Sequence, residues 1–281
     1  MENETITLVA TDLDGTFLDS HKKVPAINRE VISCLKDHGI LFGIASGRPI
    51  ETVRPMIHDW GIEQDVSFIV GMNGGVLYDL RRRDKEEYHL ISSNVVLKII
   101  RFFEDLDVEF HVVMGPTRYT SKSNEKTRAD ALMFGETEIE VNMHEFMQNR
   151  DINKLMMHFE PSYMPVILER ASHFYDARVV GFATSDTLFE YVDPHINKGF
   201  GMKKLAKHYG VPLETIMAFG DAPNDQEMLG LVGCGVCMAN GSKESKMNAR
   251  YVTTLTNDEG AVGHFIEDHL LKKGEGNVSV G

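Results

Sequence analysis

The segment from Thr7 to Thr16 reads Thr-Leu-Val-Ala-Thr-Asp-Leu-Asp-Gly-Thr, and its two halves differ in character. The first half is short, apolar and rich in residues that suit a buried strand. The second half brings two carboxylates, Asp12 and Asp14. A strand followed by an ordinary acidic turn gives the same pattern, because Asp and Gly are common turn residues. Ligands of open parallel sheets bind at the carboxyl ends of the strands, so the segment also predicts the edge of a reaction centre.

Three further apolar segments end in polar loops in the same way. Residues 40–45 lead into Ser46-Gly-Arg-Pro, residues 66–70 into Met72-Asn-Gly-Gly, and residues 215–219 into Gly220-Asp-Ala-Pro-Asn-Asp. Apolar residues at helical spacing fill the intervals, as in residues 26–38, which Gly39 follows at the position of a helix cap. Strands that alternate with helices are typical of a parallel sheet. We therefore predict an α/β fold: a Rossmann-like parallel-sheet core with helices on both faces.

A dense charged run at residues 81–87 interrupts this alternation. Such a run is most often a solvated turn or an exit from a domain. Beyond it, strands come in pairs with helices between them, which predicts a mostly antiparallel α+β insert. The predicted strands are residues 109–114, 154–160, 178–183 and 188–192, and the predicted helices are residues 94–106 and 162–174. The alternation of strands and helices resumes after Asn197.

These boundaries predict a discontinuous core, formed by residues 1–83 and 194–281, and an inserted cap domain of residues 84–193. The last ten residues, 272–281, have no periodicity, and we expect them to be disordered.

Composition narrows the functional class. The chain has 281 residues, 42% of them apolar, and a net charge of −13, which argues against a protein that tracks a nucleic-acid backbone. No apolar run approaches the ~20 residues that span a bilayer, and the N-terminus lacks the pattern of a signal peptide. Three cysteines fit a reducing compartment, so we expect a cytoplasmic protein.

The cysteines and histidines give no sign of a metal or redox site. Cys234 and Cys237 form a C-x-x-C, but they lie in an apolar segment that is typical of a buried strand, and no second pair accompanies them. We predict that both are core residues. The 12 histidines are scattered without ligand spacing, and we expect them to be surface residues or core residues with satisfied hydrogen bonds.

The four polar loops together offer oxygen ligands and phosphate donors. Their carboxylates would repel each other in one crevice unless a cation lay among them, and an all-oxygen site suits Mg²⁺. Lys198 and Ser46 are suited to phosphate oxygens, as a point charge and as a hydroxyl donor. A carboxylate nucleophile that forms an aspartyl-phosphate is one established route for phosphoryl transfer. We assign Asp12 as the nucleophile and Asp14 as the general acid and base.

These motifs, in this order, resemble the four motifs of the haloacid dehalogenase superfamily: Asp12-Leu-Asp-Gly-Thr, Ser46-Gly-Arg, Lys198-Gly and Gly220-Asp-x-x-Asn-Asp. The insert resembles, in position and size, the C2-type cap of the Cof-like phosphatases. The resemblance implies a Mg²⁺-dependent phosphatase with Asp12 and Asp14 as catalytic residues. The metal ligands it implies are Asp12, Asp14 (through its carbonyl), Asp221 and Asp225. The expected phosphate-binding and substrate-binding residues are Thr16, Ser46, Gly47, Arg48, Asn73, Lys198 and Asn224.

The resemblance also assigns Asn224 and Asp225 to holding the lysine and a metal-bound water. The chain departs from the common pattern at one place, where Ala222 and Pro223 stand instead of the Gly-Asp-Asn that often precedes the final Asn-Asp. A side-chain amide near the metal is therefore missing. Asn73 lies in a loop that resembles the Asn-Gly-Ala loop of the family, although a plain glycine-rich turn has the same composition.

Three functional readings remain open from the sequence. The first is hydrolysis of a small phosphorylated metabolite, with a sugar phosphate favoured and pyridoxal phosphate or flavin mononucleotide as alternatives. The second is a phosphomutase that returns the phosphoryl group to a sugar, and the third is a non-catalytic protein that binds a phosphorylated ligand. Intact Asp12 and Asp14 count against the third. We expect no nucleic-acid or membrane partner, and a monomer or weak homodimer.

Overall fold

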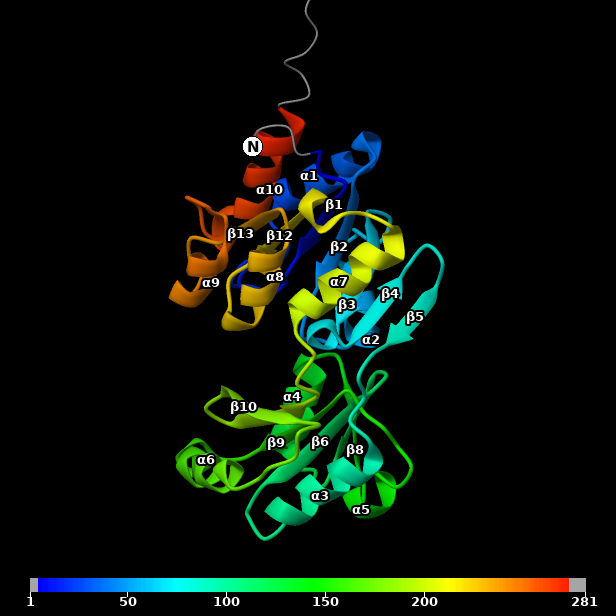
Figure 1. Ribbon diagram of the computed structural model, residues 1–281, viewed down its shortest axis with the longest axis vertical. Coiled ribbons are helices and arrows are strands. Elements are labelled where there is room, and N and C mark those ends of the chain that lie inside the picture. The colour runs from blue at the N-terminus through cyan, green and yellow to red at the C-terminus, as the bar shows by residue number, and fades with distance from the viewer. Residues whose placement is uncertain (1–4, 273–281) are drawn as a thin grey trace, which may run out of the picture. The chain divides into compact units, whose positions relative to one another are not determined.

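The computed structural model describes residues 5–272 and divides the chain into two compact units. Unit 1 comprises the chain up to Glu86 together with the part from Asn197 onward, and unit 2 comprises Glu87–Ile196 (Figure 1). The sequence analysis predicted junctions before residue 84 and after residue 193, each a few residues earlier in the chain than these. Of the tail that was predicted to be disordered, residues 273–281 lie outside the described part.

Unit 1 contains an eight-stranded sheet in the order β14-β13-β12-β1-β2-β3-β4-β5. Its strands are β1 (Leu8–Thr11), β2 (Leu41–Ala45), β3 (Val66–Gly71), β4 (Val76–Asp79), β5 (Asp84–Glu87), β12 (Ile216–Gly220), β13 (Cys234–Cys237) and β14 (Tyr251–Val252). Its helices are α1 (Ala26–Leu35), α2 (Ile50–Asp59), α7 (Lys198–Tyr209), α8 (Gln226–Leu231), α9 (Lys243–Asn248) and α10 (Ala261–Ile266). This arrangement confirms the predicted α/β class.

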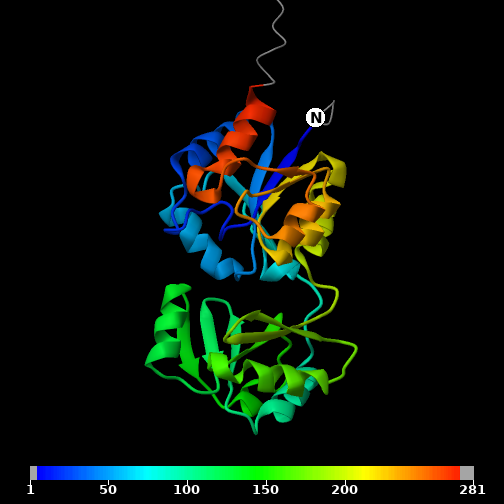
Figure 2. The ribbon, with the colours of Figure 1, turned by 90° about the vertical axis from the view of Figure 1, so that its left-hand side faces the viewer.

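Helices cover both faces of this sheet, which explains why its central strands read as continuous apolar runs. Figure 2 shows α1, α2 and α10 on one side of the sheet and α7 and α8 on the other. All four residues of β1 and all six of β3 are buried. An alternating pattern would have placed polar side chains against one of the two helical layers.

The functional loops follow four neighbouring strands of this sheet. β12, β1, β2 and β3 are parallel to one another, with Leu8 of β1 opposite Ile216 of β12 and Leu41 of β2. The carboxyl ends of parallel strands share one edge of a sheet. The loops that begin at Asp12, Ser46, Met72 and Asp221 therefore lie along the same edge, as their common pattern predicts.

Two parts of unit 1 were missed in the sequence. The charged run at residues 81–87 contains β5, which joins the sheet beside β4, and β4 pairs with β3 in the antiparallel sense. The helix α10 was also missed, because its six residues are too few to display a helical period. Tertiary contact with α1 holds α10 in place: Asn28 donates to the carbonyl of Phe17 at 3.0 Å and accepts from the amide of Gly263 at 2.7 Å.

Unit 2 is a second α+β body, built on a six-stranded sheet in the order β10-β11-β9-β6-β7-β8. Its strands are β6 (Glu109–Met114), β7 (Thr117–Thr120), β8 (Thr137–Glu140), β9 (Lys154–His158), β10 (Val180–Ser185) and β11 (Leu188–Val192). Its helices are α3 (Ser93–Phe103), α4 (Glu125–Met133), α5 (Met143–Phe146) and α6 (Met164–Ser172). The sheet is antiparallel except for the parallel pair β7 and β8.

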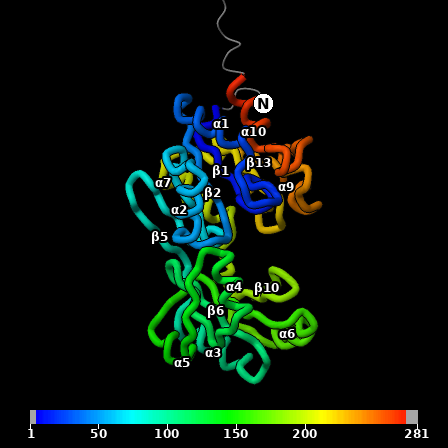
Figure 3. Tube along the Cα trace, turned by 180° about the vertical axis from the view of Figure 1, so that it is seen from behind, coloured from blue at the N-terminus to red at the C-terminus, as the bar shows by residue number. Residues whose placement is uncertain are grey.

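Only one face of the unit 2 sheet carries the apolar core. Phe110, Val112 and Leu155 pack there with the apolar faces of α3, α5 and α6. The helix α4 belongs to the other face, where Asn124 at its N-terminus bonds to Glu109 of β6; Figure 3 shows α4 and α3 on different sides of β6. The sequence analysis missed α4 because it has no apolar stripe: the residues it buries are Thr127 and Ala131.

Cys234 and Cys237 are both buried in β13, as predicted from their apolar setting. Among residues 5–272, no helix combines the length and the apolar character that crossing a membrane requires.

We predict that Asn28→Ala lowers the free energy of unfolding of unit 1 by about 3 kcal/mol. The change leaves two buried backbone groups without a partner, and each such group costs about 1–3 kcal/mol. Urea unfolding followed by tryptophan fluorescence measures unit 1 selectively, since Trp60, the only tryptophan, packs against the core of that unit. Ser33→Ala on the exposed side of α1 is the matched control, and an equal effect of the two changes would contradict the bridging role of Asn28.

Candidate active site

A buried lysine joins two of the acidic loops. Nζ of Lys198 lies 2.5 Å from Oδ1 of Asp12 and 2.6 Å from Oδ1 of Asp225. The side chains of Lys198 and Asp225 have no exposed surface. A buried ammonium is stable only when carboxylates compensate its charge. These two contacts therefore fix the loop after β1 and the loop after β12 relative to each other.

The sequence around Lys198 directs its side chain inward. Asn197 caps α7 by accepting a hydrogen bond from the amide of Phe200 at 2.8 Å, so Lys198 occupies the first helical position. A cation at a helix N-terminus meets the positive end of the helix dipole. The carboxylates of Asp12 and Asp225 offset this unfavourable placement. Burial alone would lower the pKa of Lys198, but the charges of the two carboxylates raise this pKa above its ordinary value.

Asp225 uses both carboxylate oxygens to hold other groups. Oδ1 accepts from Lys198, while Oδ2 accepts from the amides of Asp221 and Ala222, each at 2.9 Å. The Asp225 side chain therefore shapes the turn that presents Asp221. Gly220 is required for this turn, because a Cβ at that position would lie 2.6 Å from Cβ of Asp225.

Asp221 stands at the end of β12, where the loop after β1 reaches it. The hydroxyl of Thr16 donates to Oδ1 of Asp221 at 2.7 Å. Gly15 has a φ of +81°, and a Cβ there would lie 2.5 Å from Oδ2 of Asp221. Glycine is thus demanded twice at this position, by the left-handed backbone and by the close approach of a carboxylate.

Three carboxylates come together at this point. Asp12, Asp221 and Asp225 each present an oxygen, and these oxygens lie within 4.8 Å of one another. Burial raises the pKa of Asp12 to about 7, with Lys198 opposing the rise and Asp225 adding to it. Burial and the charge of Asp225 also raise the pKa of Asp221 to about 6, against the hydrogen bond from Thr16. The cluster has more negative charge than Lys198 compensates, so its donor set fits a divalent cation that prefers oxygen ligands.

The carboxylate of Asp14 does not belong to this cluster. Arg48 binds it with two nitrogens, with Nη2 3.0 Å from Oδ2, and Nζ of Lys22 lies 2.7 Å from Oδ1. Burial raises the pKa of Asp14, but the hydrogen bond from Lys22 and the charge of Arg48 outweigh it and lower the pKa below its ordinary value. Asp14 is therefore ionised in this arrangement.

The loops after β2 and β3 supply neutral polar groups. Ser46 is 3% exposed, and its Oγ accepts from the amide of Arg48 at 3.2 Å, which leaves the hydroxyl proton for an acceptor. The amide of Asn73 donates to the carbonyl of Ser46 at 3.1 Å, and the Asn73 side chain accepts from Asn224 at 3.1 Å. The absence of a side chain at Gly47 leaves room for the side chain of Asn73, since a Cβ at position 47 would lie 3.1 Å from Oδ1 of Asn73.

The structure changes the partners of several predicted residues. Thr16 and Arg48 were expected to bind phosphate, but here they bind Asp221 and Asp14. Lys22 was missed, and only its position in the loop after Asp14 pointed to it. The expectation that every histidine is a surface residue or a satisfied core residue was wrong for His111, which is buried and has no hydrogen-bond partner at either ring nitrogen.

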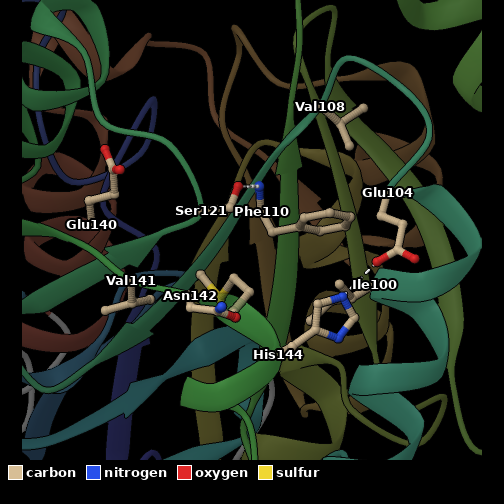
Figure 4. A pocket seen from close by; sticks show the side chains of 10 residues that line it. Ile100, Glu104, Val108, Phe110, Ser121, Glu140, Val141, Asn142 and His144 are labelled. Carbon is tan, nitrogen blue, oxygen red and sulfur yellow. Dashed lines mark hydrogen bonds and ion pairs between the residues drawn. The ribbon is translucent and has the colours of Figure 1, made fainter.

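A hollow of about 600 Å³ lies elsewhere, in unit 2 (Figure 4). Apolar side chains such as Ile100 and Phe110 line it, together with Glu104 and His144, which pair with each other at 2.6 Å. None of the predicted site residues lines this hollow. The carboxylates of the cluster, Asp12, Asp221 and Asp225, all lie in unit 1.

Comparison with known proteins identifies the family of the chain. The sequence profile of the haloacid dehalogenase-like hydrolases matches residues 9–266, so the chain belongs to that family. It is 30% identical to a putative phosphatase of Streptococcus pyogenes serotype M6, an alignment that covers 95% of this chain and 99% of the relative. It is 29% identical to a 5-amino-6-(5-phospho-D-ribitylamino)uracil phosphatase of Bacillus subtilis, covering 94% and 97% of the two chains.

A solved haloacid dehalogenase-like hydrolase from Bacteroides thetaiotaomicron has the same fold, with a TM-score of 0.85 at 24% identity over 94% of this chain and 99% of its own. The family and these relatives establish the protein as a phosphatase.

We predict that Asp12 and Asp221 make the metal-free protein less stable as the pH rises from 3.8 towards about 7, against the opposite contribution of carboxyls with lowered pKa values such as Asp14. Within this window the native carboxyls of Asp12 and Asp221 hold protons that the unfolded chain has released, so the free energy of unfolding falls by up to about 1.4 kcal/mol per pH unit for each proton. Urea unfolding in EDTA, followed through Trp60, measures the slope. Asp221→Asn should flatten it, whereas the exposed Asp37→Asn should not.

Saturating Mg²⁺ should reverse the trend and make unit 1 more stable at pH 7 than at pH 5, because a metal binds the ionised carboxylates. Equal slopes in EDTA for the wild type and Asp221→Asn would contradict the raised pKa of Asp221.

Proposed function

We propose that the protein is a Mg²⁺-dependent phosphatase that hydrolyses small phosphomonoesters through a phosphoryl group carried on Asp12. The observation that supports this most directly is the arrangement of Asp12: its carboxylate ends a buried strand, contacts the buried ammonium of Lys198 and lies beside Asp221. A positioned carboxylate with a cation on one side and a metal site on the other suits attack on phosphorus.

Asp12 and Asp221 are the carboxylates that we assign to the metal, together with the backbone carbonyl of Asp14. Mg²⁺ bound there would neutralise charge on both the phosphate and the nucleophile. Asp225 was predicted as a ligand, but both of its oxygens accept hydrogen bonds from protein groups. We therefore assign Asp225 to holding Lys198 and the Asp221 turn, and Thr16 to orienting Asp221.

The reaction has two displacements at phosphorus. In the first, the Asp12 carboxylate forms a bond to phosphorus, the bond to the ester oxygen breaks, and the proton of Asp14 passes to that oxygen. In the second, water attacks phosphorus, its proton passes to Asp14, and the bond between phosphorus and Asp12 breaks. Inorganic phosphate leaves, and both carboxyls return to their starting states.

Asp14 needs a proton for the first displacement, yet its contacts with Arg48 and Lys22 keep it ionised. We infer that the phosphate competes for these cations, because a dianion attracts a guanidinium more strongly than one carboxylate does. Transfer of Arg48 from Asp14 to the phosphate removes a main cause of the depressed pKa. Substrate binding would in this way favour the protonated form of Asp14, which is the acid of the first displacement. The same transfer would explain how Arg48 can bind phosphate although it binds Asp14 in this structure.

The phosphate oxygens then have donors on several sides: the hydroxyl of Ser46, the ammonium of Lys198 and the guanidinium of Arg48, with Gly47 leaving room at the loop. Asn73 and Asn224 bind each other, so we assign them to holding the loops after β3 and β12 together. The site residues all belong to unit 1, so we assign the choice of leaving group to unit 2.

We favour a small polar leaving group such as a sugar or sugar alcohol. A relative of nearly the same length is named for a substrate in which the phosphate sits on a ribityl chain, which supports this class. The phosphomutase alternative differs in one observable, since a phosphatase releases inorganic phosphate into water without a bisphosphate activator.

We predict that Asp12→Asn lowers kcat at least about 10³-fold on every substrate, because the amide keeps the shape of the carboxylate but is not a nucleophile. The assay measures phosphate release from a panel of phosphorylated metabolites and from an aryl phosphate, with Mg²⁺ and without a bisphosphate. The exposed Asp37→Asn is the control and should retain full activity. Activity of Asp12→Asn within tenfold of the wild type would refute the assignment.

A further inference from the structure

Three metal-ligating side chains meet on the face of the unit 2 sheet that lies opposite its apolar core. Glu109 and His111 are two residues apart on β6, so they point to the same side, and His158 of β9 stands directly opposite Glu109 in the strand register. Oε2 of Glu109 lies 3.4 Å from Nδ1 of His158 and 3.7 Å from Nε2 of His111. One ligand atom from each of the three residues lies within 4.8 Å of the others.

The same group contains buried polar atoms that form no hydrogen bond, although Glu109 lies at ion-pair distance from both histidines. His111 is 3% exposed, and neither of its ring nitrogens has a hydrogen bond. Oε2 of Glu109 is also buried without one. Buried polar atoms are nearly always satisfied, and the exceptions call for an explanation. A metal ion would satisfy Oε2 of Glu109 and one ring nitrogen of His111 together.

The carboxylate of Glu109 is oriented by a residue outside the group. Nδ2 of Asn124 donates to Oε1 of Glu109 at 2.9 Å, and the Asn124 amide cannot turn over, because its Oδ1 accepts from the amide of Thr127. Oε1 is therefore occupied, and Oε2 is the oxygen that faces the two histidines. Orientation of a ligand by a neighbouring hydrogen bond is a regular feature of metal sites.

We propose that Glu109, His111 and His158 bind one divalent transition-metal ion of the Zn²⁺ type, separate from the cation at the Asp12 cluster. Two imidazoles and one carboxylate suit zinc and its neighbours, whereas Mg²⁺ and Ca²⁺ prefer oxygen ligands alone. The fourth position would belong to water. The ion would join β6 to β9 and, through Asn124, would fix the first turn of α4, the helix that lacks an apolar stripe.

A second histidine group provides the competing explanation for any zinc binding. His89, Asp193 and His195 also lie within 4.8 Å of one another, but two of the three are exposed, and His195 is already paired with Asp193 at 2.8 Å. The Asp12 cluster is a third place where a divalent ion can bind. The experiment must therefore separate three sites in one protein.

Zn²⁺ binding to the full-length metal-free protein is measured by competition with a chromophoric chelator, in excess Mg²⁺ to fill the Asp12 cluster. We expect one tight equivalent, lost in Glu109→Gln and His158→Gln with an affinity decrease of more than about 100-fold. Asn124→Ser keeps a good helix cap but loses the donor to Glu109, and we expect a decrease of about 10–100-fold. Co²⁺ in place of Zn²⁺ should give the visible spectrum of a four-coordinate site.

His144→Gln, which removes a half-buried histidine of the same unit, and His195→Asn, which breaks the second group, should leave the tight equivalent in place. Circular dichroism and melting of each variant in EDTA show whether it folds without metal, so that unfolding is not mistaken for loss of a ligand. The proposal is overturned if the wild type binds no tight equivalent, or if that equivalent survives Glu109→Gln and disappears in His195→Asn or Asp221→Asn.

Discussion

The buried ion pairs of Lys198 set the geometry on which the active site depends. One ammonium contacts the carboxylate that ends β1 and a carboxylate in the loop after β12, at 2.5 and 2.6 Å. Removal of one partner from such a group leaves an uncompensated buried charge, which costs about 3–5 kcal/mol. These ion pairs therefore fix the positions of the two loops relative to each other. A change of rotamer at Asp12 would leave the buried ammonium of Lys198 without one of its two carboxylate partners.

The positions of the charged groups explain why four carboxylates of the site differ in behaviour. These are the carboxylates of Asp12, Asp14, Asp221 and Asp225. Both carboxylate oxygens of Asp225 accept hydrogen bonds, from Lys198 and from two backbone amides, so this residue positions other groups. Burial, together with the charge of Asp225, raises the pKa values of Asp12 and Asp221. Asp14, only two residues from Asp12, has the opposite environment, with two cations and a lowered pKa. Chemically equal side chains thus receive different roles from the groups around them.

The sequence predicted the location of the site better than its contacts. Asp12, Ser46 and Asp221 could be placed together because the strands that precede them are parallel, and parallel strands end at one edge. The partners of Thr16 and Arg48 could not be predicted, since they depend on the left-handed backbone at Gly15 and on the path of the loop after β2.

The sequence analysis missed elements without a hydrophobic period for a related reason. The helix α4 buries only Thr127 and Ala131, and its capping by Asn124 is a contact that propensity does not reveal. The pairing of Glu109 and His111 with His158 requires the register of β6 and β9, two strands that are distant in sequence. Long-range register, rather than local pattern, decides which histidines meet.

The central claim, that Asp12 carries the phosphoryl group, is tested most directly by trapping it. The Asp14→Asn variant lacks the base for the second displacement, so the intermediate should accumulate when an aryl phosphate with a good leaving group is mixed with the Mg²⁺-loaded protein and quenched in acid. Mass spectrometry of the peptides should then show one added phosphoryl group on the peptide that contains Asp12. Phosphate release from the quenched reaction with no phosphorylated peptide, or a phosphoryl group on any other residue, would contradict the account.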